Sequence, residues 1–192
     1  MAGEFGGRRL AVPRGTRTRP TADRVREALF SILGDISGAR VLDLYAGSGA
    51  LGIEALSRGA ESAVFVERNP YAVAAIERNL ASLGLDEEIV AHDAERFLER
   101  AERFPGRAEG EAIAPARAEP APSRTTFDLV FCDPPYDSAS RLAGPLAERL
   151  PALTSEGARI VTESDKRMPL ELPFPLLTER TYGDTRIAIH AR

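Results

Sequence analysis

Residues 39–52 read Ala-Arg-Val-Leu-Asp-Leu-Tyr-Ala-Gly-Ser-Gly-Ala-Leu-Gly, and this stretch decides the fold. Its first part, residues 40–45, is a short and largely apolar run of the kind found in buried parallel strands. Glycines follow at positions 47 and 49, and residues 50–57 then have the pattern of a helix. A strand, a glycine turn and a helix together predict a nucleotide-cofactor site, because glycines let a ligand approach the backbone and the new helix offers free N–H groups.

Two cofactors compete for this loop. The run Gly47-Ser-Gly-Ala-Leu-Gly52 satisfies the dinucleotide pattern GxGxxG, and Glu67 follows 20 residues after Gly47, so the glycines alone do not exclude NAD. Asp43 favours S-adenosylmethionine, because a carboxylate at the end of the first strand can face the cationic methionine portion of that cofactor, whereas it would repel a pyrophosphate. A glycine turn without a ligand is the least expected of the three, because all these residues fall where a site needs them.

The composition is typical of one globular domain. A chain of 192 residues with 43% hydrophobic residues can bury a substantial core, and no apolar run approaches the length of about 18 residues that a membrane helix needs. The amino terminus lacks the apolar part of a signal peptide, and the single cysteine, Cys132, excludes a disulfide framework and a cysteine-rich metal site. We therefore expect a cytoplasmic protein without a metal ion, in which Cys132 is a core residue.

The charge is distributed unevenly along the chain. The net charge is −4, but residues 1–26 hold seven arginines against Glu4 and Asp23 and carry +5, so the remainder carries −9. A basic arm on an acidic body indicates a polyanion bound at one place, with a solvated tail as the alternative. We divide the chain into a basic amino-terminal arm, residues 1–20, and one domain, residues 21–192. The arginines expected to contact nucleic acid are Arg8, Arg9, Arg17, Arg19, Arg24 and Arg26.

The rest of the chain alternates between strand and helix patterns. We predict strands at 40–45, 62–67, 88–91, 127–132, 159–163, 176–180 and 186–190, and helices at 20–33, 50–57, 70–83, 93–103 and 142–150. This alternation predicts an α/β, Rossmann-like fold with a mostly parallel seven-stranded sheet and helices on both faces. We also expect Thr21 to cap the first helix, residues 4–12 to form a short strand or hairpin, and the low-complexity residues 105–123 to form a mobile loop.

Four carboxylates fall at or near the ends of predicted strands. They are Asp43, Glu67, Asp93 and Asp133. Ligands of a parallel sheet bind beyond the carboxyl ends of its strands, so we expect these side chains to share one site. Glu67 can accept hydrogen bonds from two ribose hydroxyls. Asp93 can cap the following helix or bind the adenine amino group, and these two roles are compatible.

The tetrapeptide Asp133-Pro134-Pro135-Tyr136 suits methylation of an amino group on a nucleic-acid base. The lone pair of such a nitrogen is delocalised into the ring. Asp133 and the Pro134 carbonyl can each accept one of its hydrogens and direct the lone pair, and hydrogen bonds to charged groups contribute about 1.5–3 kcal/mol. The prolines hold the carbonyl in place, and Tyr136 can stack on the base, which contributes roughly 1–3 kcal/mol. Methyl transfer would be an in-line attack assisted by positioning. The alternative is a proline-rich turn after a strand.

Several stretches resemble the RsmD family of methyltransferases. They are Arg19-Pro-Thr-Ala-Asp-Arg-Val-Arg-Glu-Ala-Leu-Phe30, Leu42-Asp-Leu-Tyr-Ala-Gly-Ser-Gly-Ala-Leu-Gly-Ile-Glu-Ala-Leu-Ser-Arg-Gly59, Asp133-Pro-Pro-Tyr136 and Tyr182-Gly-Asp-Thr185. The resemblance covers nearly the whole chain. It implies a class I S-adenosylmethionine-dependent methyltransferase that modifies the N2 amino group of one guanine in 16S rRNA, within an assembled or assembling small ribosomal subunit, and an arm that contacts the RNA. The implied catalytic residues are Asp133, Pro134, Pro135 and Tyr136, and the implied cofactor contacts are Asp43, Ala46, Gly47, Gly49, Glu67 and Asp93.

Three other functions compete with this one. A DNA adenine-N6 methyltransferase uses the same tetrapeptide, although no segment resembles a separate target-recognition domain. An NAD-linked oxidoreductase would use the glycine loop but lacks an obvious proton donor, since His92 and His190 are the only histidines. A non-enzymatic RNA-binding module would explain the arm but would leave residues 133–136 without a purpose.

Overall fold

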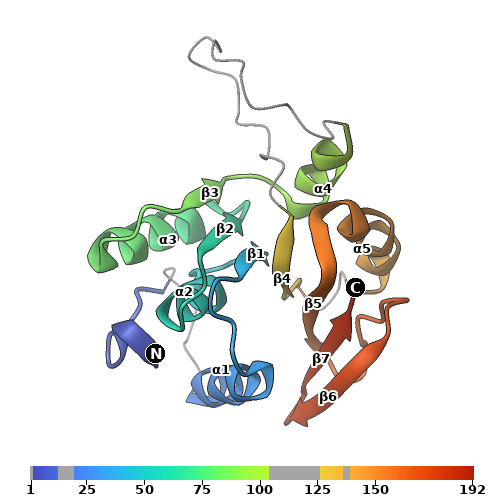
Figure 1. Ribbon diagram of the computed structural model, residues 1–192, viewed down its shortest axis with the longest axis horizontal. Coiled ribbons are helices and arrows are strands. Elements are labelled where there is room, and N and C mark those ends of the chain that lie inside the picture. The colour runs from blue at the N-terminus through green and yellow to red at the C-terminus, as the bar shows by residue number, and fades with distance from the viewer. Residues whose placement is uncertain (1, 13–19, 104–125, 136–138) are drawn as a thin grey trace.

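Strand β1 (Arg40–Leu44) lies inside the sheet, with β2 and β4 paired parallel to it on its two sides. The computed structural model describes residues 2–12, 20–103, 126–135 and 139–192, in which seven strands form one sheet in the order β3-β2-β1-β4-β5-β7-β6 (Figure 1). The loop predicted at 105–123 lies outside the described residues. The remaining strands are β2 (Ser62–Val66), β3 (Glu88–Val90), β4 (Phe127–Cys132), β5 (Thr154–Asp165), β6 (Leu176–Tyr182) and β7 (Thr185–Ala191).

The sheet is parallel from β3 to β5 and becomes antiparallel at the terminal hairpin. β7 runs antiparallel to β5, and β6 runs antiparallel to β7. The predicted turn between the last two strands is confirmed, since Tyr182 pairs with Thr185 and Gly183 takes a φ of 66°. The strand order reverses between β1 and β4, and this switch point is where open α/β sheets bind their ligands.

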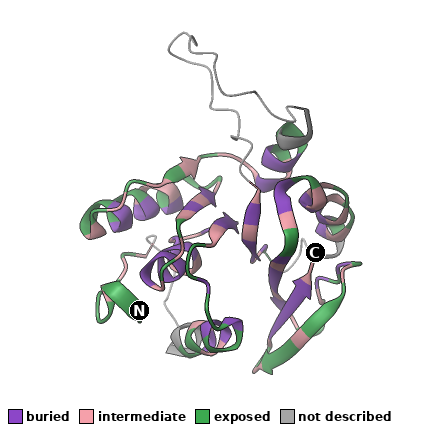
Figure 2. Cartoon of the chain, in the orientation of Figure 1, coloured by how far each residue is buried: buried purple, intermediate pink, exposed green. Residues whose placement is uncertain are grey.

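Helices cover both faces of the sheet, as predicted. Their bounds are α1 (Pro20–Leu33), α2 (Ala50–Ser57), α3 (Pro70–Leu83), α4 (Ala94–Arg103) and α5 (Ala139–Leu153). Buried residues of α1, α2 and α3 pack on one face, and those of α4 and α5 pack on the other (Figures 1 and 2). Side chains of β1 pack alternately in the two layers, with Val41 in the first and Leu42 in the second, because successive side chains of a strand point to opposite faces.

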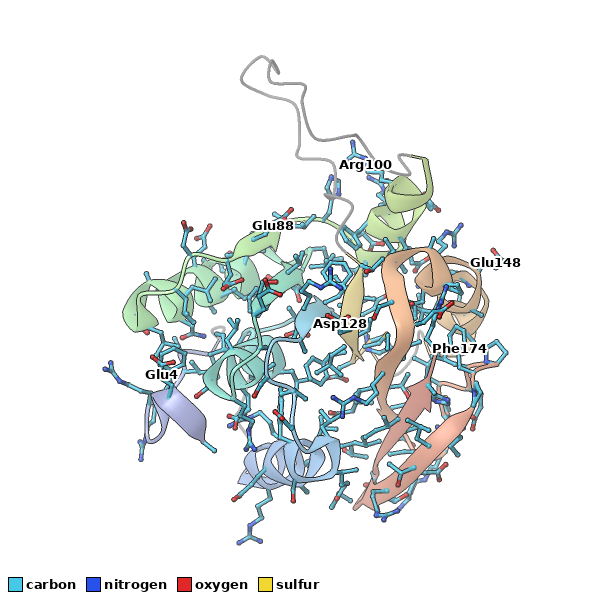
Figure 3. All side chains as sticks on the ribbon, in the orientation of Figure 1. Glu4, Glu88, Arg100, Asp128, Glu148 and Phe174 are labelled. Carbon is cyan, nitrogen blue, oxygen red and sulfur yellow. The ribbon has the colours of Figure 1, made fainter. Side chains whose placement is uncertain are left out.

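Side chains fill both layers between the sheet and its helices (Figure 3). Phe30 of α1 packs on Phe131 of β4 with ring centroids 5.7 Å apart, and both side chains are buried. Cys132 is buried in the second layer, in agreement with its predicted place in a core strand. None of the helices in the described ranges is long and apolar enough to cross a membrane.

Helix α3 shows how local chemistry sets the ends of an element. The Asn69 side chain accepts a hydrogen bond of 2.9 Å from the Tyr71 N–H, and Pro70 occupies the first turn, where its missing N–H costs nothing. Gly84 ends the helix with a φ of 71°, a conformation that glycine adopts without strain. The helix therefore has the bounds that the sequence predicted.

The amino-terminal segment differs from its prediction. Residues 4–12 contain no strand or hairpin, because a short 3-10 helix, η1 (Gly3–Phe5), is followed by a loop. Side chains of the domain accept hydrogen bonds from the backbone of this segment: the Phe5 N–H donates to Ser57 Oγ, and the Ala11 N–H donates to Asn79 Oδ1. A strand partner is thus unnecessary. Helix α1 begins at Pro20, so Thr21 lies within its first turn and is not the N-cap.

Candidate active site

The turn after β1 holds the backbone in a sparsely populated conformation. Tyr45, Gly47 and Gly49 have φ values of 61°, 57° and 77°. Glycine adopts such angles readily, whereas a bulky residue held there stores strain of about 1–3 kcal/mol, a feature that concentrates at functional sites. Gly52 has a packing role instead, because a Cβ at that position would lie 2.4 Å from the Phe65 ring and would push α2 away from the sheet.

Glu67 follows the end of β2 and organises this turn. Its Oε2 accepts a hydrogen bond of 2.9 Å from the Gly47 N–H, and its Oε1 accepts one of 2.7 Å from the Asn69 N–H. The carboxylate therefore joins the glycine loop to the start of α3. Each carboxylate oxygen has a second lone pair, so these bonds leave acceptor capacity for ribose hydroxyls. The ribose contact itself stays a prediction.

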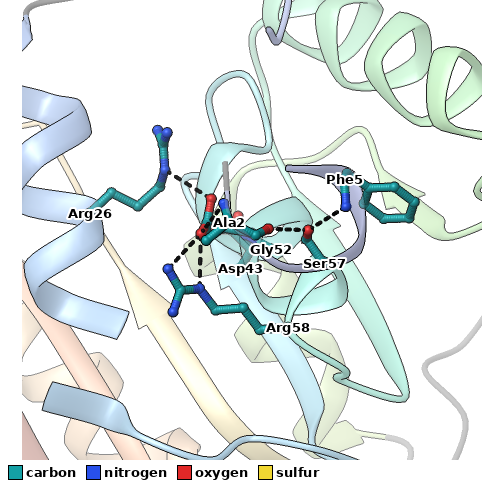
Figure 4. A network of polar contacts seen from close by, with 8 residues as sticks. Ala2, Phe5, Arg26, Asp43, Gly52, Ser57 and Arg58 are labelled. Carbon is teal, nitrogen blue, oxygen red and sulfur yellow. Dashed lines mark hydrogen bonds and ion pairs between the residues drawn. The ribbon is translucent and has the colours of Figure 1, made fainter. Parts of the chain in front are cut away.

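Asp43 lies below the loop, in the interior. Its side chain is 2% exposed, and its Oδ2 accepts a hydrogen bond of 2.9 Å from the Gly52 N–H, so it holds the first turn of α2 (Figure 4). Burial raises the pKa of Asp43 to about 7; the nearby Asp133 and Glu67 act in the same direction, and the Gly52 bond opposes them. Burial thus disfavours the charged form of Asp43, and a positive charge placed beside it would favour that form.

Asp93 lies between β3 and α4 and caps the helix. Its Oδ1 accepts a hydrogen bond of 3.0 Å from the Glu95 N–H, and its Oδ2 lies 3.1 Å from Arg68 Nη1. The capping role predicted from the sequence is therefore present. The contact with an adenine amino group stays a prediction.

A cavity of about 360 Å³ opens at the carboxyl edge of the sheet, and residues 133–135 of the tetrapeptide line it. Of the residues predicted for a site, Glu67, Asp133, Pro134 and Pro135 line it together. Asp43, Ala46, Gly47, Gly49 and Asp93 are not among its lining residues, and Tyr136 lies outside the described part of the chain. The side chains lining the cavity that the sequence did not single out are Tyr45, Val66, Arg68, His92, Ala94 and Glu163.

Two carboxyl groups share this cavity. Asp133 follows the end of β4, and Glu163 lies near the end of the neighbouring strand β5. Burial raises the pKa of both side chains, and the negative charge of Asp133 raises that of Glu163 further. A carboxyl with a raised pKa is poised to exchange a proton near neutral pH. No group of three or more His, Cys, Asp or Glu side chains within the described ranges could hold a metal ion.

Glu163 could have been found from the sequence, and Tyr45 could not. A strand was predicted at 159–163, so Glu163 satisfied the same strand-end rule that identified Asp43 and Asp133. The unusual backbone of Tyr45 has no sequence signal. Its hydroxyl is buried and makes no hydrogen bond within the described residues, although the ring lines the cavity.

The amino-terminal segment is fastened to α2 by two buried polar residues (Figure 4). Glu54 is 2% exposed and accepts a hydrogen bond of 3.1 Å from the Ala2 N–H, while pairing with Arg58 at 2.8 Å. Ser57 donates to the Ala2 carbonyl and accepts from the Phe5 N–H. Helix α2 therefore begins at the glycine loop after β1, and residues in its second half hold the amino-terminal segment.

Asn79 of α3 connects the amino-terminal segment to the glycine loop after β1. Its Oδ1 accepts from the Ala11 N–H at 2.7 Å, and its Nδ2 donates to the carbonyl oxygens of Ala11 at 3.0 Å and Ser48 at 2.9 Å. Its side chain is 2% exposed. One amide group thus holds the basic segment and the glycine turn in a fixed relation.

A second cavity, of about 550 Å³, lies between the amino-terminal segment, α1 and α2. The arginines lining it are Arg8, Arg9, Arg26 and Arg58, alongside Glu27 and Glu54. Arg8, Arg9 and Arg24 are exposed, and their contact with nucleic acid stays a prediction. Arg26 is less accessible, because its Nε lies 3.5 Å from the buried Glu54 carboxylate and its side chain is 16% exposed. Arg17 and Arg19 lie outside the described residues.

The fold and the cavity define a class of protein. The chain has the Rossmann-like fold of the class I S-adenosylmethionine-dependent methyltransferases. It superposes on the solved structure of "Putative methyltransferase yhhF" from Escherichia coli with a TM-score of 0.77 and 31% sequence identity, covering 100% of this chain and 96% of that chain.

Sequence comparison then identifies the family. The chain is 36% identical to the "Putative rRNA methyltransferase YlbH" of Bacillus subtilis, over 100% of this chain and 97% of that protein. It is 32% identical to the "Ribosomal RNA small subunit methyltransferase D" of Haemophilus influenzae, over 95% of this chain and 88% of that protein. The family described as "Conserved hypothetical protein 95" matches residues 1–109. The chain belongs to the RsmD family of ribosomal RNA methyltransferases.

Proposed function

We propose that this protein transfers a methyl group from S-adenosylmethionine to the N2 amino group of a guanine in 16S rRNA. The single observation that carries the proposal is the cavity of about 360 Å³ that Glu67, beside the glycine loop, lines together with Asp133, Pro134 and Pro135. A cofactor and a base must both reach one cavity for direct transfer, and this one lies at the switch point of the sheet.

The chain fits S-adenosylmethionine better than a dinucleotide. The buried carboxylate of Asp43, with its pKa raised to about 7, suits a cationic ligand and disfavours a pyrophosphate. When bound, S-adenosylmethionine supplies a methyl group on a sulfonium sulfur, and its transfer leaves a neutral thioether. The residues proposed to hold it are Asp43, Ala46, Gly47, Gly49, Glu67 and Asp93.

The tetrapeptide positions the nucleophile. The Asp133 carboxylate and the Pro134 carbonyl accept the two hydrogens of the amino group, and the lone pair of N2 then points away from them. Pro134 and Pro135 restrict the backbone, so the acceptors keep this geometry. As N2 gains its bond to the methyl carbon it must lose one proton, and Asp133, whose pKa is raised by burial, is the acceptor for that proton. Tyr136 is proposed to stack on the base.

The basic arm is proposed to bind the RNA backbone. Exposed arginines neutralise phosphates and release counterions, a term that contributes to affinity without reading sequence. The target base must leave its stack to reach Asp133, so RNA already opened within a small ribosomal subunit, in the cytoplasm, is the proposed substrate. Residues 1–20 are proposed as the RNA-binding arm and residues 21–192 as the methyltransferase domain. DNA adenine methylation is the competing function, because Asp133 and Pro134 alone do not distinguish the two amino groups.

The test offers unmodified small subunits, naked 16S rRNA and duplex DNA to the purified protein with labelled S-adenosylmethionine. Each product is digested to nucleosides and identified by mass spectrometry. We expect N2-methylguanosine from the RNA substrates, and we expect Asp133→Ala to abolish it while the affinity for the cofactor is retained. Glu156→Gln, at an exposed position far along β5 from the cavity, is the control that should keep full activity. N6-methyladenine in the DNA would overturn the assignment to guanine.

A further inference from the structure

Glu163 and Asp133 occupy equivalent places on neighbouring strands. β4 pairs in parallel with β5, and Cys132 is the partner of Thr162, so the next residue of each chain segment is Asp133 and Glu163. Adjacent strands lie about 4.8 Å apart, and paired residues of parallel strands project to the same face. Both side chains line the cavity, together with Pro134 and Pro135. The two carboxyl groups therefore face one ligand together.

These carboxyl groups differ from the others at the same edge of the sheet. The carboxylates of Asp43, Glu67 and Asp93 each accept a hydrogen bond from a backbone N–H. In the described part of the chain, by contrast, no donor group bonds to the side chains of Asp133 and Glu163, and no cation pairs with them. Both side chains are half-buried and line the cavity, so their carboxyl oxygens are open to a ligand that brings N–H donors.

The bases differ in what they present to such a pair. On its Watson–Crick edge guanine has an N1–H beside the N2 amino group, so it offers donors to both carboxylates. Adenine and cytosine have an amino group beside an unprotonated ring nitrogen, and the lone pair of that nitrogen would face the second carboxylate. N–H donors of a bound ligand favour the ionised form of both groups, and two ionised acceptors side by side match guanine and oppose the other two amino-bearing bases.

We propose that Glu163 accepts the N1–H of the target guanine and thereby selects guanine as the base. This inference rests on the proposed function, because it places the N2 amino group on Asp133 and Pro134. Glu163 would distinguish guanine from adenine, a distinction that Asp133 and Pro134 alone do not make. The bond also draws the N1 proton towards the carboxylate, which increases electron density in the N1–C2–N2 unit and counteracts the delocalisation that weakens N2 as a nucleophile.

The test combines a change at N1 of the target base with a substitution of Glu163, as in a double-mutant cycle. Matched RNA substrates carry guanine or 2-aminopurine at the target nucleotide; 2-aminopurine keeps the amino group but has an unprotonated N1. The wild type should prefer guanine by about 10- to 100-fold in kcat/KM, the equivalent of one hydrogen bond to a charged group. Glu163→Leu should lose most of its activity on guanine and little on 2-aminopurine, so that the preference collapses.

Glu163→Gln keeps the proposal falsifiable if the leucine variant does not fold. Its amide oxygen can still accept the N1–H of guanine, and its amide N–H can donate to the unprotonated N1 of 2-aminopurine. We expect this variant to narrow the preference by gaining activity on 2-aminopurine. Glu156→Gln serves as the matched control and should keep the wild-type preference. Cofactor affinity of each variant reports on the integrity of the site.

The outcomes distinguish a failure of base selection by Glu163 from a failure of the proposed guanine methylation. An unchanged preference in both Glu163 variants, or an equal loss on the two substrates, would show that Glu163 is structural and would overturn the proposal. Absence of guanine methylation by the wild type would refute the proposed function itself, whatever the variants do. A preference that falls only in the Glu163 variants would establish the residue as a determinant of base specificity.

Discussion

Asp43→Asn removes a buried ionisable group and keeps the side-chain oxygen that accepts the Gly52 N–H. In the wild type, burial raises the pKa of Asp43 from 3.8 to about 7, aided by Asp133 and Glu67. The folded state therefore favours the protonated form. The stability that this contributes is complete below the unfolded-state pKa near 3.8, and it is lost as pH rises through the folded-state pKa of about 7.

The expected magnitude follows from these two pKa values. Each pKa unit corresponds to about 1.36 kcal/mol, so ionisation of Asp43 lowers the free energy of unfolding by about 4 kcal/mol at most, of which roughly 3 kcal/mol falls between pH 5 and pH 8. The asparagine variant has no such loss. Its free energy of unfolding relative to the wild type should therefore increase by roughly 3 kcal/mol over this range, or about 6–12 °C in Tm for a chain of this size.

Urea unfolding of both proteins at pH 5 and pH 8 measures this difference. Asp128→Asn is the control, because the pKa shift of Asp128 has the opposite sign (Asp128 is labelled in Figure 3). Hydrogen bonds from Arg40 lower the pKa of Asp128 to about 2. That variant should be less stable than the wild type at pH 8, by about 1 kcal/mol or less. A difference between Asp43→Asn and the wild type that stays the same at both pH values would refute the reasoning. Titration calorimetry should also show weaker binding of S-adenosylmethionine to Asp43→Asn.

Two further predictions concern the amino-terminal arm. Asn79→Ala removes the hydrogen bonds to Ala11 and Ser48, so limited proteolysis should cleave the arm faster and the affinity for the cofactor should fall, by an amount corresponding to about 1–3 kcal/mol; unchanged cleavage would show that Asn79 does not hold the arm. The double substitution of Arg8 and Arg9 by Ala should weaken RNA binding, reduce the slope of log K against log salt by about 0.7 for each phosphate that is no longer neutralised, and leave cofactor affinity unchanged. An unaltered salt slope would remove these arginines from the interface.

Most of the fold could be predicted because its signals are local. Helices α2 and α3 and strand β4 have the predicted bounds, since apolar periodicity and turn residues act within a few positions. The longest boundary error is at β5, which was expected over 159–163 and extends from Thr154 to Asp165. Its amino-terminal part, with Glu156 and Gly157, has no strand pattern, and sheet pairing rather than propensity extends it.

The candidate site was predicted only in part. The strand-end rule placed Asp43, Glu67 and Asp133 at one edge because parallel strands end together. It did not reveal that Glu67 accepts a hydrogen bond from the Gly47 N–H, nor that Arg26 lies beside the buried Glu54 carboxylate. Those contacts depend on how helices and loops pack, and a single sequence has no period or motif that reports them.

The sequence by itself determined the alternation of strands and helices, the glycine loop after β1 and the carboxylates at the strand ends, because each depends on residues close together in the chain. Tertiary structure alone decided the contacts between distant residues. Asn79 holds Ala11 across a separation of 68 positions, and Ser57 holds Phe5 across 52. The register of β4 and β5 brings Glu163 beside Asp133. These arrangements arise when the sheet closes around its core, because backbone pairing and burial then fix the partners that local propensity leaves undetermined.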